Sequence, residues 1–147
     1  MTQHIEIAEM FGTASGYVVG SSAEQVGNYL AEHTEHNLRV AEWVKANCHQ
    51  VALLKHLNVD EDVRGLGHGN DLLEQFIAEA EDAGADAIML ISDSGEVQAV
   101  GFELAEWYEG FDFVQVLATT GGPLMVYPRE FGERMKAMID IAQGEGR

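Results

Sequence analysis

The sequence predicts an α/β fold in which helices flank a mixed central sheet. Its 147 residues suit one domain of ordinary size. Apolar residues make up 46% of the chain and charged residues 22%, which is typical of a globular protein with one packed core. In the middle of the chain, apolar segments at 51–59 and 87–91 enclose a helical pattern at 72–80. This strand-helix-strand order is the building unit of α/β folds.

The N-terminal third predicts a hairpin followed by helices. Residues 4–8 and 16–20 have strand character, and the small residues Gly12 to Ser15 between them favour a turn. From Val26 to Val44, apolar residues then recur at helical spacing. One long helix or two short ones should therefore fill residues 23–47.

The segment 51–59 is apolar at both alternate positions, as expected for a strand that is buried on both faces. A glycine-rich turn, Arg64-Gly65-Leu66-Gly67-His68-Gly69, separates this strand from the helix at 72–80, which should end at Gly84. Residues 87–91 predict the next buried strand.

The last third predicts a helix, two strands and a second helix. Ser94 can cap a helix that runs to about Tyr108. Residues 113–117 and 124–127 predict two strands around a turn. From Arg129 onwards, apolar residues gather on one face of an amphipathic helix.

The charge of the chain limits its partners. Lys and Arg number 8 against 25 Asp and Glu, which gives a net charge of −17. A nucleic-acid backbone would add like charge to like, so we expect no nucleic-acid ligand. The acidity favours cationic partners such as amines, polyamines or a basic protein surface.

The sequence contains no signal for export or for membrane insertion. Cys48 is the single cysteine, so no internal disulfide can form, which favours a reducing compartment. Residues 1–10 lack the basic region and the apolar block of a secretory signal. The longest apolar run, 87–91, is far shorter than the roughly 20 residues that a membrane helix needs. We therefore expect a cytoplasmic protein with no membrane contact.

The glycine-rich turn is the motif that carries chemistry. Such a turn before a helix exposes backbone N–H groups at the positive end of the helix dipole, which suits a phosphate or a diphosphate. A P-loop needs Lys-Ser or Lys-Thr after its last glycine, and this chain has Asn70-Asp71. A dinucleotide-binding fold with Asp86 on the ribose is an alternative, although the glycines are spaced G-x-G-x-G rather than G-x-G-x-x-G. A tight turn with only a structural role is a further alternative.

Residues 57–73 resemble the acyl-CoA signature of the GNAT superfamily of N-acyltransferases. In that family a strand ends in Val, an Arg or Gln five residues later opens Arg/Gln-x-x-Gly-x-Gly/Ala, and a helix with paired leucines follows; Val59, the segment from Arg64 to Gly69, and Leu72-Leu73 match these positions. A second segment, Trp107-Tyr108-Glu109-Gly110-Phe111-Asp112-Phe113, resembles the family's Phe-Tyr-Glu-x-x-Gly-Phe. The two matches and their strands span residues 51–127.

The resemblance implies acetyl-CoA as the acyl donor. Backbone N–H groups over residues 65–70 would hold its diphosphate, and the strand before the loop would pair with the pantetheine arm. An N–H near Leu57 would stabilise the oxyanion as an amine attacks the thioester. The expected cofactor-binding residues are Leu57, Asn58, Val59, Arg64, Gly65, Leu66, Gly67, His68, Gly69 and Asn70.

The resemblance also points to catalytic residues. Tyr108 corresponds to the tyrosine that protonates the departing CoA thiolate in many members, and a phenol is protonated at neutral pH. Taken alone, Tyr108 and Trp107 at this spacing are more typical of core aromatics than of a catalytic site. His56 is the candidate base for the amine, because its reference pKa is the most suitable at pH 7. Asp60, Glu61 or a water relay are alternatives, since Leu53 stands where some members carry a base glutamate.

The chain departs from the family pattern at three places. Gly101 replaces an Asn that contacts the acyl-pantetheine, and Asp112 replaces the Gly before the last Phe of the second motif. A standard member runs strand, two helices and then a hairpin, whereas here the hairpin comes first, so the N-terminal part is shortened or rearranged. We expect one GNAT-like domain over 1–147, with a variable acceptor-side part at 1–50, an acyl-CoA core at 51–127 and a C-terminal helix at 128–147.

Together these features predict an N-acetyltransferase that moves an acetyl group from acetyl-CoA to a primary amine of a small molecule or a protein. The alternative from another class is a binding or effector protein of the same fold, such as a phage-encoded one, that docks on a partner protein with or without CoA. A homodimer is a further expectation. No metal is expected, because His33 and His36 lack a third ligand at metal spacing.

Overall fold

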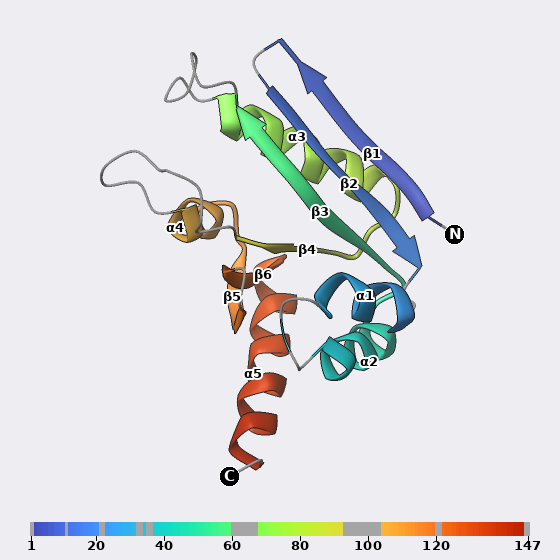
Figure 1. The fold of residues 1–147 in the computed structure, drawn as a ribbon, viewed down its shortest axis with the longest axis vertical. Coiled ribbons are helices and arrows are strands. Elements are labelled where there is room, and N and C mark those ends of the chain that lie inside the picture. The colour runs from blue at the N-terminus through green and yellow to red at the C-terminus, as the bar shows by residue number, and fades with distance from the viewer. Residues whose placement is uncertain are drawn as a thin grey trace. The chain divides into compact units, whose positions relative to one another are not determined.

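The computed structural model describes residues 2–10, 12–20, 23–31, 34, 37–59, 68–92, 104–119 and 122–145. Over these residues the strands form a six-stranded sheet in the order β1-β2-β3-β4-β6-β5, flanked by helices (Figure 1). The mixed α/β fold class predicted from the sequence is therefore confirmed. In chain order the elements are β1 (Thr2–Glu9), β2 (Gly12–Gly20), α1 (Ala23–Leu30), α2 (Asn37–Asn47), β3 (Gln50–Val59), α3 (His68–Asp82), β4 (Ala87–Ile91), α4 (Leu104–Glu109), β5 (Val114–Thr119), β6 (Gly122–Tyr127) and α5 (Arg129–Glu145).

The chain divides into two compact units, each made from two separate stretches of sequence. The first unit comprises Met1–Gly20 and His49–Ile88, and the second comprises Ser21–Cys48 and Met89–Arg147. The single domain over 1–147 and its inner boundaries stay predictions.

The first unit begins with the antiparallel hairpin β1–β2. The sequence predicts its turn at Gly12 to Ser15, and this prediction is wrong. Those residues lie in β2, where Gly12 pairs with Glu9 and Ala14 with Ile7. The ladder continues as far as the pair of Glu9 and Gly12, so the strands pair further than the sequence predicts. The small residues are therefore strand residues, and Gly12 and Ala14 are buried.

Strand β3 and helix α3 complete the core of the first unit. β3 pairs antiparallel with β2, and α3 packs on β1, β2 and β3. Both faces of the first half of β3 are buried, as the apolar pattern predicts, at Val51, Ala52, Leu53 and Leu54. The buried positions of α3 recur at helical spacing, at Leu72, Leu73, Phe76 and Ala80. A Cβ added at Gly16 of β2 would clash with the carbonyl oxygen of Leu53 in β3 and would lie 2.9 Å from the ring of Phe76, so the neighbouring strand and the helix together require glycine there.

The second unit packs helices against the hairpin β5–β6. α5 and α4 both contact these two strands. The predicted amphipathic pattern of α5 is confirmed, since Phe131, Met135 and Ile139 form its buried face. Gly132 lets α5 approach the strands closely, because an added Cβ would lie 2.8 Å from the Cβ of Val114.

Residues 23–47 form two short helices, α1 and α2, which pack against each other. Trp43 of α2 meets Phe131 of α5 edge-on, with ring centroids 5.0 Å apart. The guanidinium of Arg134 lies 5.6 Å from the centroid of the same Trp43 ring, and its Nη2 donates to Oδ1 of Asn47 at 2.8 Å. These contacts attach α2 to α5.

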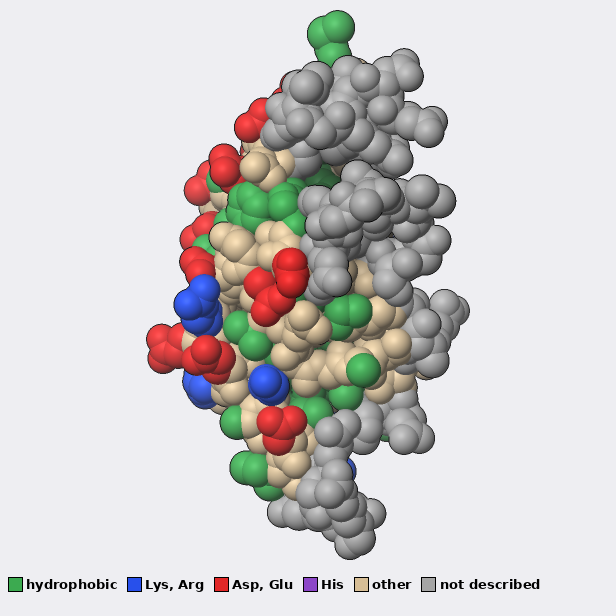
Figure 2. All heavy atoms as spheres, turned by 90° about the vertical axis from the view of Figure 1, so that its left-hand side faces the viewer, with side chains coloured by type: hydrophobic (Ala, Val, Ile, Leu, Met, Phe, Trp, Pro, Cys, Tyr) green, Lys and Arg blue, Asp and Glu red, His purple; other side chains and the backbone are tan. Residues whose placement is uncertain are grey.

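The order of elements confirms that the hairpin precedes the two helices and that these precede β3. The predicted helix that ends near Tyr108 is described only from Leu104, because residues 93–103 lie outside the described part. Among the described residues, no helix has the length and apolar character needed to cross a membrane. On the face drawn in Figure 2, acidic side chains are spread among apolar and other polar groups, in keeping with the net charge of −17.

Candidate functional site

The first candidate region is the junction between β3 and α3. β3 ends at Val59, as predicted, and α3 begins at His68. The predicted start of the helix at residue 72 is therefore wrong, and His68 and Gly69 are helical rather than part of the turn. Residues 60–67, with Arg64, Gly65, Leu66 and Gly67 among them, lie outside the described part. His68, Gly69 and Asn70 form the first turn of the helix.

The start of α3 has the properties that an anion needs. The first turn of any helix carries N–H groups that have no carbonyl partner four residues back, and the helix dipole places partial positive charge there. α3 is 15 residues long, so this dipole is well developed. Asp71 also lies in the first turn, and its carboxylate would compete with a bound anion for the same positive end. A diphosphate would therefore have to be held mainly by the residues before Asp71.

The end of β3 carries the other expected binding residues. Leu57 is half-buried and pairs with Ala14 of β2, and Asn58 and Val59 continue the same ladder. His56, the candidate base, lies opposite Ser15 in that ladder, and its side chain is outside the described set, as are those of Asn58 and Val59. The backbone of these residues is therefore placed in a strand, while the role of the His56 side chain stays a prediction.

Sequence reasoning missed a β-bulge beside His56. The register shifts between Ser15 and Gly16, which pair with His56 and Leu54, so Lys55 is an extra residue in β3. The Nζ of Lys55 lies 5.9 Å from the ring centroid of Tyr17, and burial raises the pKa of the Tyr17 hydroxyl. Bulges are frequent next to active sites because they re-aim side chains. The isolated Gly16 within a strand was the available signal.

Asp86 has a structural role at the opposite end of β3. Its Oδ2 accepts hydrogen bonds from the backbone N–H of His49 at 2.8 Å and of Gln50 at 3.2 Å. Its own N–H donates to the carbonyl of Gln50 at 2.8 Å. The carboxylate that the dinucleotide alternative would assign to a ribose is thus already engaged, which disfavours that alternative.

The second candidate region surrounds Tyr108 in α4. Tyr108 is only 5% exposed, and burial raises the pKa of its hydroxyl well above the ordinary value. Its ring lies 4.9 Å from that of Trp107 and meets the ring of Phe113 edge-on at 5.7 Å. Phe113 in turn lies 5.4 Å from the ring of Tyr127. The side chain is therefore fixed by an aromatic cluster, and it stays protonated at neutral pH.

The residues after Tyr108 form a Schellman cap on α4. The N–H of Asp112 donates to the carbonyl of Glu109 at 3.1 Å, and the N–H of Phe113 donates to that of Tyr108 at 3.3 Å. Asp112 has a positive φ of 71°, the conformation that this cap requires. The contact between Phe113 and Tyr108 is the apolar contact that accompanies the motif. The position is one where glycine is favoured, and this explains why the family pattern has glycine at the site of Asp112.

The two candidate regions belong to different compact units, the junction of β3 and α3 to the first and Tyr108 to the second. Asp60, Glu61 and Gly101, which the sequence analysis singled out, lie outside the described part, as do His33 and His36. Within the described part, no group of three or more His, Cys, Asp or Glu residues could hold a metal ion. Cys48 is buried.

Known structures and sequences give the following similarities. No curated protein sequence matches the chain. Among solved structures, it is similar to the anti-CRISPR protein AcrVA5, with 15% identity, a TM-score of 0.48, and coverage of 85% of this chain and 98% of that one. It is similar to an acetyltransferase with 24% identity, a TM-score of 0.47, and coverage of 80% and 61%. It is also similar to the apo form of a mutant agmatine N-acetyltransferase, with 12% identity, a TM-score of 0.49, and coverage of 80% and 68%.

The family comparison covers the junction of β3 and α3. Residues 7–103 match the Acetyltransferase (GNAT) family, and this range contains β3, the glycine-rich segment and α3. It spans more than half of the 147 residues. The resemblance inferred from residues 57–73 is therefore confirmed, and this protein belongs to the GNAT acetyltransferase family.

Proposed function

We propose that this protein transfers an acetyl group from acetyl-CoA to a primary amine. The observation that supports this most is the order of β3, glycine-rich segment and α3 within the range that matches the GNAT family. A helix N-terminus directly after Gly65 and Gly67 favours an anion that approaches the backbone closely. The diphosphate of CoA is negatively charged, and its oxygens must come close to the backbone N–H groups to be held.

The chain would supply a binding site for the cosubstrate, a base for the amine and a proton donor for the leaving thiolate. N–H groups over residues 65–70 would hold the diphosphate, and Leu57 to Val59 would bind the pantetheine arm as a sheet binds an added strand. His56 or a water molecule would take a proton from the amine, whose nitrogen then bonds to the thioester carbonyl carbon as the C–S bond breaks. The attacking nitrogen sheds its second proton to the base or to water as the amide forms. The departing thiolate takes a proton through the hydroxyl of Tyr108, which regains one from solvent, so charge and protons balance.

Burial of Tyr108 has two consequences for this role. The raised pKa keeps the phenol neutral across the physiological range, so it can donate without being tuned. The same burial makes it a weaker acid than an exposed tyrosine. We therefore expect it to act through a hydrogen bond that strengthens as negative charge develops on sulfur, which is stabilisation specific to the transition state.

The net charge supports a cationic acceptor. A charge of −17 raises the local concentration of amines, polyamines and lysine side chains near the protein. The same field opposes the anionic cosubstrate, so a local positive end at the start of α3 is needed to bind it. A primary amine on a small molecule or on a basic protein fits both conditions.

Release of free thiol from acetyl-CoA tests this proposal. The protein is incubated with acetyl-CoA and, in separate reactions, with a polyamine, a small monoamine and a lysine-rich peptide, and we expect thiol release that depends on one of them. Tyr108→Phe should slow release by about 100-fold, the usual size of a general-acid contribution. Tyr127→Phe removes a hydroxyl next to Phe113, in the same aromatic cluster, and should leave the rate unchanged.

Two results would contradict the proposal, one its enzyme activity and the other the role of Tyr108. One is CoA binding with no thiol release from any acceptor, which would favour the binding or effector protein of the same fold. The other is equal rates for Tyr108→Phe and the unmodified protein, which would remove Tyr108 from the chemistry while leaving acetyl transfer itself in place.

A further inference from the structure

Strand β1 has an open edge. It stands first in the sheet order, and within the described residues its ladder partner is β2, so no described strand pairs with its other side. An edge of this kind presents a row of unpaired N–H and C=O groups. β1 is eight residues long, enough for a substantial ladder with an added strand.

The register shows which residues face the open edge. Glu9 pairs with Gly12, and only two residues lie between them. This closing pair must exchange both of its hydrogen bonds, because the alternative pattern would need a bond between the two adjacent turn residues. Since hydrogen-bonded and non-hydrogen-bonded pairs alternate, the N–H and C=O groups of His4, Glu6 and Ala8 point away from β2. These three residues are also exposed.

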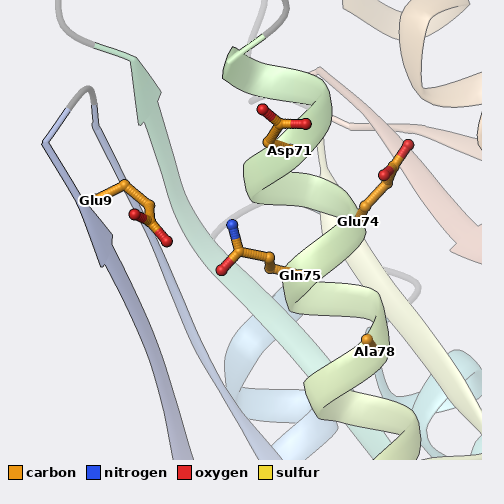
Figure 3. A pocket seen from close by; sticks show the side chains of 5 residues that line it. All are labelled: Glu9, Asp71, Glu74, Gln75 and Ala78. Atoms are coloured by element: carbon orange, nitrogen blue, oxygen red, sulfur yellow. The ribbon is translucent and has the colours of Figure 1, made fainter.

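A hollow of about 390 Å³ lies beside this edge, between the end of β1 and helix α3. It is lined by Glu9, Asp71, Glu74, Gln75 and Ala78. Ile5 and Ile7 of β1 are buried beneath α3, and Glu9 has the same parity, so its side chain lies on the α3 side of the sheet. Figure 3 shows the side chains of Glu9 and Gln75 pointing toward one another across the hollow.

The charge around the edge selects the partner. Glu6 and Glu9 of β1 and Asp71 and Glu74 of α3 are all exposed. The described residues of β1, β2 and α3 include no Lys or Arg. A second copy of this chain would bring its own acidic β1 against this one, and like charges facing each other across a ladder are unfavourable. A basic strand would instead form favourable charge pairs with these carboxylates.

We propose that the open edge of β1 binds an extended, basic polypeptide segment as an added strand. Its backbone would pair with the N–H and C=O groups of His4, Glu6 and Ala8. Side chains of an added strand point alternately to the two faces of the sheet. On the α3 face, Lys or Arg side chains would enter the hollow beside Glu9 and Asp71. The site therefore favours Lys or Arg at alternate positions, and this inference stands apart from acetyl transfer.

The probe is a short capped peptide of alternating Thr and Lys, measured by fluorescence anisotropy without acetyl-CoA. We expect binding that weakens with salt, and about tenfold or greater loss when the backbone nitrogens that pair with β1 are methylated, because several hydrogen bonds disappear. A peptide with Glu in place of Lys should not bind. Omitting acetyl-CoA keeps this result separate from the outcome of the thiol assay.

Variants of the protein test both parts of the interaction. Ala8→Pro removes an N–H that faces the open edge, a change that edge strands tolerate, and should weaken binding about fivefold or more, whereas Ala8→Val keeps that N–H and should not. Glu9→Gln with Asp71→Asn should weaken binding by about tenfold, since exposed charge pairs contribute modestly each. Glu133→Gln in α5 makes the same type of change elsewhere and should have no effect.

Three results would overturn the inference. Equal binding of the methylated and unmethylated peptides would mean that charge alone attracts the probe. Unchanged binding by the Glu9 and Asp71 variant would mean that the hollow takes no part. Concentration-dependent dimerisation that Ala8→Pro abolishes, seen by analytical ultracentrifugation, would assign the edge to a second copy of the chain.

Discussion

Two helix ends, one in each compact unit, share a hydrogen-bonding pattern but differ in the residue at its centre. α3 is capped at Gly84 and α4 at Asp112, with φ angles of 92° and 71°. At both ends the following residue donates its N–H to the carbonyl five positions back, at 2.9 Å for Ala85 and 3.3 Å for Phe113. Glycine adopts this conformation freely, whereas a residue with a side chain loses about 1 kcal/mol. The same cap is thus relaxed in the first unit and strained in the second.

The units also differ in their use of charge. In the second unit, Arg129 forms an ion pair with Asp112 at 2.9 Å, and Arg134 contacts Trp43 and Asn47. In the described part of the first unit, Lys55 is the single Lys or Arg, and it lies over Tyr17. Arg129 and Arg134 of the second unit therefore serve internal contacts, whereas in the described part of the first unit a single Lys stands among many carboxylates. From this contrast we expect the carboxylates of the first unit to attract ligands, and the charges of Arg129 and Arg134 in the second unit to have structural roles.

The largest expected effect is on CoA binding. Gly67→Asp places a side chain and a negative charge where the diphosphate must lie, and we expect the Kd for CoA to rise by at least about 100-fold, because unfavourable like-charge contacts reach several kcal/mol. Gly20→Asp adds the same charge in the first unit at a position where an added Cβ meets no atom within 4 Å, so its Kd should be unchanged. Calorimetric titration measures both. Retained affinity in the Gly67 variant would mean that the loop does not bind CoA.

The next effect concerns the close approach of helix and strand in each unit. Gly16→Ala would press a methyl group on the ring of Phe76 and on the carbonyl of Leu53, and Gly132→Ala would press one on Val114. Overpacking of this kind costs about 1–3 kcal/mol of unfolding free energy. Gly20→Ala has open space and serves as the control. Urea denaturation of the three variants should rank Gly20→Ala well above the other two, and equal stabilities would show that the backbone relaxes at both sites.

A third prediction concerns alkaline pH. Burial raises the pKa of Tyr108 in the folded protein, whereas in the unfolded chain it ionises near pH 10. The contribution of Tyr108 to stability is therefore complete below about pH 10 and is lost as the pH rises further, by about 1.4 kcal/mol per pH unit. The Tyr108→Phe variant has no hydroxyl to ionise at this position. Between about pH 9 and 11 its free energy of unfolding should therefore fall by that much less than the free energy of unfolding of the unmodified protein. Parallel losses in both proteins would show that the hydroxyl is not shielded.

The smallest effect is at the two caps themselves. Asp112→Gly relieves the positive φ but removes an ion pair whose side chains are 62% and 63% exposed and which therefore contributes little. We expect the free energy of unfolding to rise by about 0.5 kcal/mol. Gly84→Asp makes the reverse change in α3 and should lose about 1 kcal/mol. Thermal unfolding of the pair tests whether the caps differ as proposed, and a loss in both would refute strain at Asp112.

The spacing of apolar residues predicted the type and order of the helices and strands, because it directly reflects which side chains are buried. The run 51–59 is buried on both faces in its first half, and α5 buries Phe131, Met135 and Ile139 at helical spacing. The turn of the first hairpin was misplaced because small residues at 12–15 are as compatible with a tightly packed strand as with a turn. The bulge at Lys55 depends on how β2 and β3 align, which local sequence does not specify.

The candidate site was predicted from two family patterns, and the structure gives a physical reason for one of them. The segment around Tyr108 and Asp112 is a helix cap that holds an aromatic ring in place, so its glycine and aromatic positions follow from backbone geometry. The open edge of β1 and the hollow beside it could not be predicted, since they depend on which strand ends the sheet. The roles of Arg64 to Gly67 and of His56 stay predictions.

Hydrogen exchange with and without CoA is the most direct measurement of diphosphate binding by the loop. The backbone amides of residues 57–59 and 65–70 should exchange at least about tenfold more slowly when CoA is bound, because amides that donate to a ligand exchange only after it leaves. Amides of α5 should be unaffected. Slower exchange confined to other segments, or none at all at saturating CoA, would contradict the assignment of this junction as the acyl-donor site.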